Sequence, residues 1–141
     1  MPIDHLSIAA RFAAALDAED YSAARRLLAN TCVYRINDAT IVGPDAIIDL
    51  YQTNGTSAKQ RFESVEYFGD VESIGPSMAA IAFTDRLRVG RESHEFRCRQ
   101  CVHIGWDGLI EEITHQELPR ERQRLTDFDV RVTGCGSWGG E

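Results

Sequence analysis

The chain has no long hydrophobic run. None of its apolar stretches approaches the roughly 20 residues that cross a bilayer, so we expect no membrane-spanning segment. The opening residues 1–5 carry no basic segment followed by an apolar one, and we therefore expect no secretory leader. These absences predict a cytoplasmic protein that does not bind membranes.

Positive charge is also scarce. The 15 Lys and Arg residues are outnumbered by 22 Asp and Glu residues, which gives a formal net charge of −7. A protein that binds nucleic acid needs clustered positive charge to displace the counterions of the phosphates. The balance of charge therefore argues against a nucleic-acid partner.

Cysteine is present, but not in the pattern of a metal site. Cys98 and Cys101 form a C-x-x-C motif in a segment that alternates like a strand, with His94 and His103 nearby. Residues three apart on a strand point to opposite faces, and a structural zinc site needs four ligands. We expect free thiols and neither a metal nor another cofactor. The alternative, a zinc site formed by these four residues, predicts stoichiometric zinc in the purified protein.

The spacing of the apolar residues, which make up 43% of the chain, changes once along its length. It first follows the helical period, which predicts helices over 3–17, 20–29 and 44–54 and a short strand over 32–36. It then alternates, which predicts strands over 61–71, 78–89, 94–104 and 109–118. This order indicates an α+β fold, in which helices pack on one face of an antiparallel sheet.

We assign residues 1–118 to this domain and residues 119–141 to a C-terminal extension. Within the extension, the alternation from Phe128 to Val132 predicts a short strand over 127–132. The glycine-rich end that follows is expected to be mobile.

The turns predict how the strands pair. Asp107-Gly108 is a strong signal for a two-residue hairpin loop, which places Val102 opposite Ile113 and Gln100 opposite His115. In the preceding hairpin, a loop at Arg91-Glu92 would set three pairs on the same face: Phe83 with Gln100, Asp85 with Cys98 and Leu87 with Phe96.

This mostly apolar face then carries a polar cluster of Asp85, Gln100 and His115, with neighbouring Cβ atoms within about 5–8 Å. A carboxylate and an imidazole in apolar surroundings are expected to be paired or shifted in pKa. Such groups are typical of a binding or catalytic site. The structural alternative is that Asp85 lies in water and that His115 is a satisfied core histidine.

The order and spacing of several segments resemble the nuclear transport factor 2-like (NTF2-like) superfamily, particularly its SnoaL-like and ketosteroid-isomerase-like members. The resemblance implies a cone, in which a curved antiparallel sheet wraps around three N-terminal helices, and a homodimer formed through the outer face of the sheet. The segments that carry it are Arg11–Asp20, Leu27–Tyr34, Gly43–Ile47 and Asp107–Glu112.

The resemblance to ketosteroid isomerases does not extend to their catalytic residues. Their oxyanion-holding tyrosine falls on Phe12, and their catalytic aspartate falls at or near Ile36. Their second, protonated aspartate falls near Gln100 or Val102, where Gln100 could still donate a hydrogen bond. The general base of that family is therefore missing here.

SnoaL-like polyketide cyclases are similar along the last strand, where the chain reads Gly108-Leu109-Ile110-Glu111-Glu112-Ile113-Thr114-His115. Their histidine is replaced by Ile113 and their acid–base aspartate by His115. A histidine can serve as a general base near neutral pH, so this position stays competent while its chemistry changes.

Two functions follow as hypotheses. The first is a cofactor-free acid–base enzyme of the isomerase, dehydratase or cyclase type, acting on a small apolar organic molecule. In it, His115 is the general base or acid, Asp85 orients the imidazole, and Gln100 and Tyr34 hold a substrate oxygen. The second is a non-catalytic ligand-binding or dimerisation module. In both, we expect the pocket walls to include Phe12, Tyr34, Ile36, Phe83, Val102 and Ile113.

Overall fold

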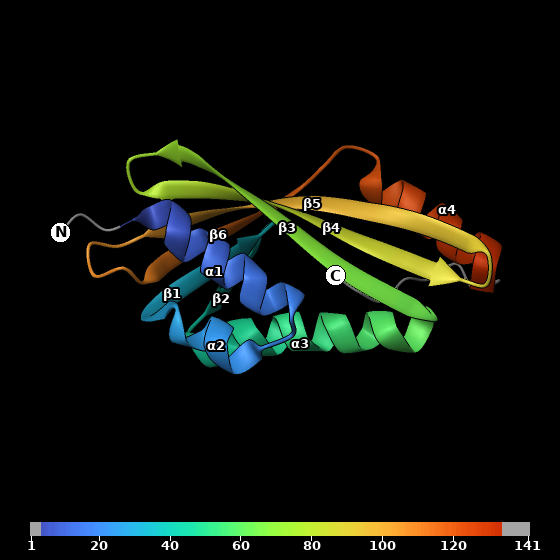
Figure 1. Cartoon of the computed structure of the whole chain (residues 1–141), viewed down its shortest axis with the longest axis horizontal. Helices are drawn as coiled ribbons and strands as arrows, with labels where there is room; N and C mark the ends of the chain where they lie inside the picture. The colour runs from blue at the N-terminus through green and yellow to red at the C-terminus, as the bar shows by residue number, and fades with distance from the viewer. Residues whose placement is uncertain (1–3, 134–141) are drawn as a thin grey trace.

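The computed structural model describes residues 4–133, which form one six-stranded sheet and four helices (Figure 1). Along the chain these are α1 (His5–Asp17), α2 (Tyr21–Arg26), β1 (Leu28–Ile36), β2 (Ala39–Val42), α3 (Pro44–Arg61), β3 (Ser64–Gly75), β4 (Met78–Val89), β5 (Glu92–Ile104), β6 (Ile110–Glu117) and α4 (Glu121–Thr133). The strands lie in the order β2-β1-β6-β5-β4-β3. The α+β class and the curved sheet are as the sequence predicts.

The sheet is mixed, whereas the pattern predicted only antiparallel pairs. β1 runs parallel to β6, with Tyr34 opposite Ile113 and Arg35 opposite Thr114. A parallel pair needs a long crossover between its strands. Here the crossover consists of β2, α3 and the whole β3–β5 meander, so the first and last strands of the cone lie side by side.

The helix starts lie within two residues of the predicted ones, and α1 ends at Asp17 as predicted, but α2 and α3 end elsewhere. The side chain of Asp20 accepts a hydrogen bond from the backbone N–H of Ala23, as an N-cap does. α3 continues through Asn54-Gly55, where we expected it to stop. Gly55 serves close packing instead, because a Cβ there would lie 3.0 Å from the Tyr21 hydroxyl and 3.5 Å from the Tyr67 hydroxyl.

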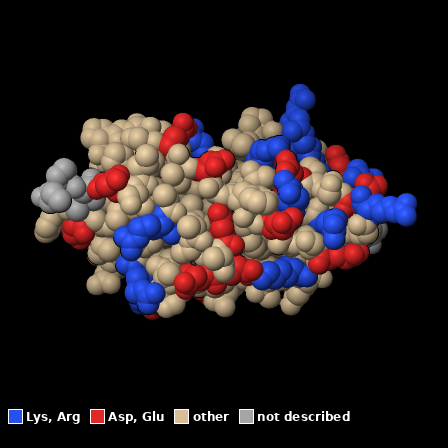
Figure 2. Space-filling model, viewed as in Figure 1, with Lys and Arg blue, Asp and Glu red and all other residues tan. Residues whose placement is uncertain are grey.

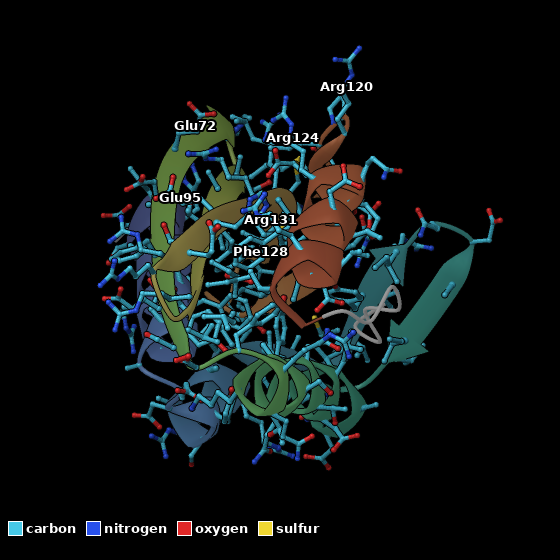
Figure 3. All side chains as sticks on the ribbon, turned by 90° about the vertical axis from the view of Figure 1, so that its right-hand side faces the viewer. Glu72, Glu95, Arg120, Arg124, Phe128 and Arg131 are labelled. Carbon is cyan, nitrogen blue, oxygen red and sulfur yellow. The ribbon has the colours of Figure 1, made fainter. Side chains whose placement is uncertain are left out.

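The strand predicted over 127–132 is wrong, because these residues belong to helix α4. Leu125 and Phe128 are buried at 0% and 1% exposure, and Val132 packs beside them, so the apolar spacing is three and four residues rather than two. They form a second core cluster with Phe62 and Leu87. In Figure 3, Phe128 turns toward the sheet while Arg120 points away from it. The predicted glycine-rich tail lies outside the described residues.

The strand pairing is right for one hairpin and shifted in the other. Gln100 lies opposite His115 and Val102 opposite Ile113, as predicted. The two-residue loop expected at Asp107-Gly108 is wrong, because β5 ends at Ile104, β6 begins at Ile110 and the register shifts after His103. Asp85, however, lies opposite Phe96 rather than Cys98, because the loop is Gly90-Arg91 and not Arg91-Glu92.

Gly90 explains this shift, since its φ of 61° is in the left-handed region, which glycine adopts at little cost. The shift is two residues along the strand, so every side chain keeps its predicted face.

Two features of the surface bear on partners. Within residues 4–133, no helix is long and apolar enough to span a membrane. On the face seen in Figure 2, basic and acidic side chains alternate without a large basic patch.

Candidate functional site

A cavity lies between the inner face of the sheet and the helices. Its volume is about 170 Å³, similar to an engineered cavity of about 150 Å³ that holds benzene in another protein. It is therefore large enough for a ring-sized organic molecule. The residues that line it are Leu16, Asp17, Tyr21, Tyr34, Ile36, Leu50, Tyr51, Asn54, Gly55, Ala58, Tyr67, Phe83, Asp85, Leu87, Phe96, Cys98, Gln100, His115, Arg122 and Leu125.

The structure divides the site residues expected from the sequence into two groups. The cavity walls contain Tyr34, Ile36, Phe83, Asp85, Gln100 and His115. In contrast, Phe12, Val102 and Ile113 are 0% exposed and lie in the main core. Val102 and Ile113 lie on the sheet, and Phe12 of α1 packs with them in the core, so these three side chains fill the interior instead of lining the cavity.

Gln100 is the hub of the polar cluster on β5 and β6. Its Oε1 accepts a hydrogen bond of 2.5 Å from the Tyr51 hydroxyl. Its Nε2 lies 3.1 Å from the Tyr34 hydroxyl and 3.2 Å from Nδ1 of His115. An amide nitrogen only donates, so Nδ1 is the acceptor, and a neutral His115 carries its proton on Nε2.

The groups of this cluster are uncharged near neutral pH. Burial lowers the pKa of His115, with a smaller opposing effect from Glu117. Burial likewise raises the pKa of Tyr34 and Tyr51 above their usual range and that of Cys98 to about 12. The imidazole is therefore a neutral ring with one nitrogen held by Gln100. No protein partner is present for its Nε2 within residues 4–133.

A second polar group, formed by Asp17, Tyr67 and Asp85, lies in the same cavity. Burial raises the pKa of Asp85 to about 7, and the charge of Asp17 adds to this effect. Burial also raises the pKa of Asp17, although the backbone N–H of Gly69 hydrogen-bonds its carboxylate and opposes the shift. Among the described residues, Oδ1 of Asp17 and the hydroxyl of Tyr67 are buried without a hydrogen-bond partner.

The pairing of Asp85 with His115 that the sequence suggested is replaced by another contact. The imidazole is bound by Gln100, and no hydrogen bond joins it to Asp85 within residues 4–133. The two residues lie on β4 and β6, with β5 between them. The role of orienting the imidazole therefore belongs to Gln100.

Sequence reasoning missed several residues of the site, including Tyr21 and Tyr67. Tyr51 was expected on the inner face of its helix, but nothing in the pattern showed that its hydroxyl binds Gln100. Asp17 ends α1, where an acidic residue usually faces solvent. Arg122 and Leu125 were missed because α4 was interpreted as an extension, although the spacing of Leu125 and Phe128 is helical.

The cysteines carry no metal site in the part of the chain that the structure describes. Cys32, Cys98 and Cys101 are free thiols. Within residues 4–133, no three side chains of His, Cys, Asp or Glu lie close enough together to hold a metal ion.

Comparison with known proteins places the fold. No family model and no curated protein matches the sequence. A candidate polyketide cyclase from Xanthomonas campestris pv. campestris is 12% identical, with a TM-score of 0.66 over 89% of this chain and 96% of that one. An LEH-like epoxide hydrolase from M. tuberculosis is 16% identical, with a TM-score of 0.63 over 91% and 90%.

A third similar structure is an NTF2-like protein of unknown function from Cytophaga hutchinsonii. It is 13% identical, with a TM-score of 0.62 over 87% of this chain and 97% of that one. Identities this low establish the fold alone. The chain thus has the NTF2-like fold.

Proposed function

We propose that the protein binds a small, largely apolar organic molecule in this cavity and catalyses proton transfer on it without a cofactor. The observation that carries the proposal is the state of His115. Its ring is neutral, one nitrogen is fixed by Gln100, and the other is left for a ligand. A buried and oriented imidazole of this kind is typical of a catalytic site.

The hydrogen bonds at the site favour His115 and Tyr34 as donors to an oxygen of the substrate. His115 Nε2–H would donate to an oxygen of the substrate. Tyr34 accepts from Gln100, so its own O–H is able to donate to the same oxygen. Two fixed donors stabilise negative charge on an oxygen as it develops in a transition state.

Asp85 is the better general base in this arrangement. Its pKa of about 7 allows it to accept and return a proton near neutral pH. A neutral His115 whose Nδ1 is occupied by Gln100 has no free acceptor nitrogen, so we assign it the donor role instead. Asp85 would remove a proton from carbon or from an attacking water.

The substrate class follows from these roles. An oxygen that receives two hydrogen bonds, in a ring-sized apolar cavity, suits a cyclic ketone or an epoxide. The names of two similar structures, a candidate polyketide cyclase and an epoxide hydrolase, support chemistry of this type. Ring closure, isomerisation and epoxide opening are all compatible with these names.

The alternative function is a non-catalytic ligand-binding or dimerisation module. Two observations favour it: Asp85 and His115 are not joined to each other, and the outer face of the sheet exposes Phe68 at 43% and Met78 at 37%. A homodimer through this face is compatible with either function. The alternative predicts ligand binding without turnover.

We expect His115→Ala to reduce turnover of a responsive substrate by at least about 100-fold, because one oxyanion donor is lost. A panel that includes 2-cyclohexenone and cyclohexene oxide, followed by mass spectrometry, would identify such a substrate. His103→Ala is the matched control, since the His103 side chain is 42% exposed and lies outside the cavity. Equal turnover by His115→Ala and wild type would contradict the assigned site, and binding without turnover in the wild type would favour the alternative.

A further inference from the structure

We infer that the end of the cavity formed by Asp17, Tyr67 and Asp85 is an ammonium site, so that the ligand carries a protonated amine. The inference deepens the proposed function, since it concerns the same cavity, and rests on it. It concerns the end of the ligand that lies farthest from His115 and states that this end is a protonated amine.

Three elements bring the acidic end together. Tyr67 of β3 lies directly opposite Asp85 of β4, so their side chains share the inner face of the sheet. Asp17 is the last residue of α1 and lies above Gly69, where a Cβ would be 3.3 Å from its Oδ2. Tyr21 of α2 adds a further ring to the same part of the wall.

Two buried polar atoms at this end have no hydrogen-bond partner within residues 4–133. Oδ1 of Asp17 and the Tyr67 hydroxyl are buried and unbonded. Asp85 is partly buried and lines the cavity, yet it forms neither a hydrogen bond nor an ion pair with a described residue. Buried polar groups are normally satisfied, so the two buried atoms, with the unpaired carboxyl group of Asp85 beside them, point to a ligand that supplies donors.

No free Lys or Arg side chain in the described cavity wall is available to balance the carboxyl groups of Asp17 and Asp85. Arg122 is the one Lys or Arg among the described cavity residues, and it already binds Glu117 at 2.7 Å. At the surface nearby, Lys59 is ion-paired with Glu19. Arg86, next to Asp85 on β4, points to the opposite face and binds Glu95 at 3.2 Å. Residues 4–133 thus place two partly buried carboxyl groups at the cavity without providing a counterion for them.

An alkylammonium group matches this environment. It has three N–H donors, which suit Oδ1 of Asp17, the carboxylate of Asp85 and the oxygen of Tyr67. The faces of Tyr21 and Tyr67 would also attract a cation. A carboxylate ligand would be repelled, and a hydroxyl has a single proton to donate. A metal ion fits poorly, because no third ligand of the usual type lies beside the two carboxyl groups in the described residues.

The ammonium would also prepare the proposed catalytic base. Without a ligand, burial and the neighbouring Asp17 favour the protonated form of Asp85. A bound cation favours the ionised form, so it lowers the pKa of Asp85. The ligand would thereby convert Asp85 into its ionised form, which is the form that can accept a proton.

The test uses three probes of similar shape: cyclohexylmethylamine, cyclohexylmethanol and cyclohexanecarboxylate. Titration calorimetry of the whole chain at pH 7 should show the amine binding at least 10-fold more tightly than the alcohol, and no binding of the carboxylate. Equal affinity for amine and alcohol, preference for the carboxylate, or no binding of any probe would overturn the inference. The first two results would leave the proposed catalysis at His115 intact.

Substitutions at single positions test which residues cause the preference for the amine. Asp85→Asn and Asp17→Asn should each remove most of the preference for the amine, while circular dichroism checks that they remain folded. His115→Ala should retain the preference, because it alters the other end of the cavity. If it abolished the preference while both Asn variants kept it, the ammonium would belong at His115 and the inference would be wrong.

Proton release gives a measurement that needs no variant. Amine binding should release close to one proton at pH 6, where Asp85 is protonated, and almost none at pH 8.5, where it is already ionised. The groups that face Asp85 are Asp17 from α1, Tyr21 from α2, Tyr67 from β3 and Cys98 from β5, and the pKa of each is raised mainly by burial. Calorimetry in buffers of different ionisation enthalpy measures the release, and its absence at pH 6 would contradict the mechanism.

Discussion

Gln100→Leu should lower the free energy of unfolding by about 3 kcal/mol, which is a large effect for a single residue. Leucine keeps the bulk of the side chain but removes all of its hydrogen bonds. The hydroxyls of Tyr51 and Tyr34 and Nδ1 of His115 would each lose their amide partner. Each buried polar group left unpaired costs about 1–3 kcal/mol, and access to cavity water keeps the sum near the lower end.

Urea denaturation of the purified chain measures this change. Gln116→Leu, at an exposed position of β6, is the matched control and should alter stability by less than about 0.5 kcal/mol. Tyr51→Phe should cost about 1 kcal/mol, because it removes only one of the three bonds. Equal stabilities for Gln100→Leu and Gln116→Leu would show that the amide is not the hub of the cluster.

Asp129→Ala should be at least as damaging, with an expected loss of about 3–5 kcal/mol. The carboxylate of Asp129 is 0% exposed and binds Arg61 through two nitrogens, with Nε–O distances of 2.9 Å and an Nη2–O distance of 2.5 Å. This pair ties α4 to the end of α3. Removal of the acid would leave the Arg61 guanidinium, which is only 24% exposed, without this carboxylate.

The loss of stability in Asp129→Ala should be greatest in helix α4. Hydrogen exchange is expected to accelerate in residues 121–132 before it does in β5, because the pair is a buried contact of this helix and the apolar cluster beneath it is small. Asp127→Ala is the control, since Asp127 is an exposed acid on the same helix. A uniform increase in exchange across the sheet would mean that the pair stabilises the whole fold rather than the attachment of α4.

The parts of this molecule that the sequence predicts are those set by local signals. Asp107-Gly108 and the alternation around it were enough to place Gln100 opposite His115. The neighbouring register was wrong by two residues, because the choice between two loop positions depended on the backbone of Gly90. Since such a shift preserves the faces, Asp85 was still placed inside the cone.

The contacts between distant segments were not predictable in this way. The period of α3 indicates that Tyr51 faces inward, but its bond to Gln100 depends on the tilt of the helix over the sheet. The segment from Phe128 to Val132 fits a strand as well as a helix, and burial against Phe62 and Leu87 decides for the helix. The raised pKa of Asp85 likewise depends on enclosure by residues far apart in sequence.

The parallel pairing of β1 with β6 has a consequence for the order of folding. It joins residues 33–35 to residues 112–114, so this closure must wait until nearly the whole chain is available. Because Tyr34 comes from β1 and His115 from β6, the two donors meet only after that closure. A growing chain on the ribosome would therefore hold no formed cavity until its last strand had emerged, and bound ligand would mark the molecules that have completed the fold.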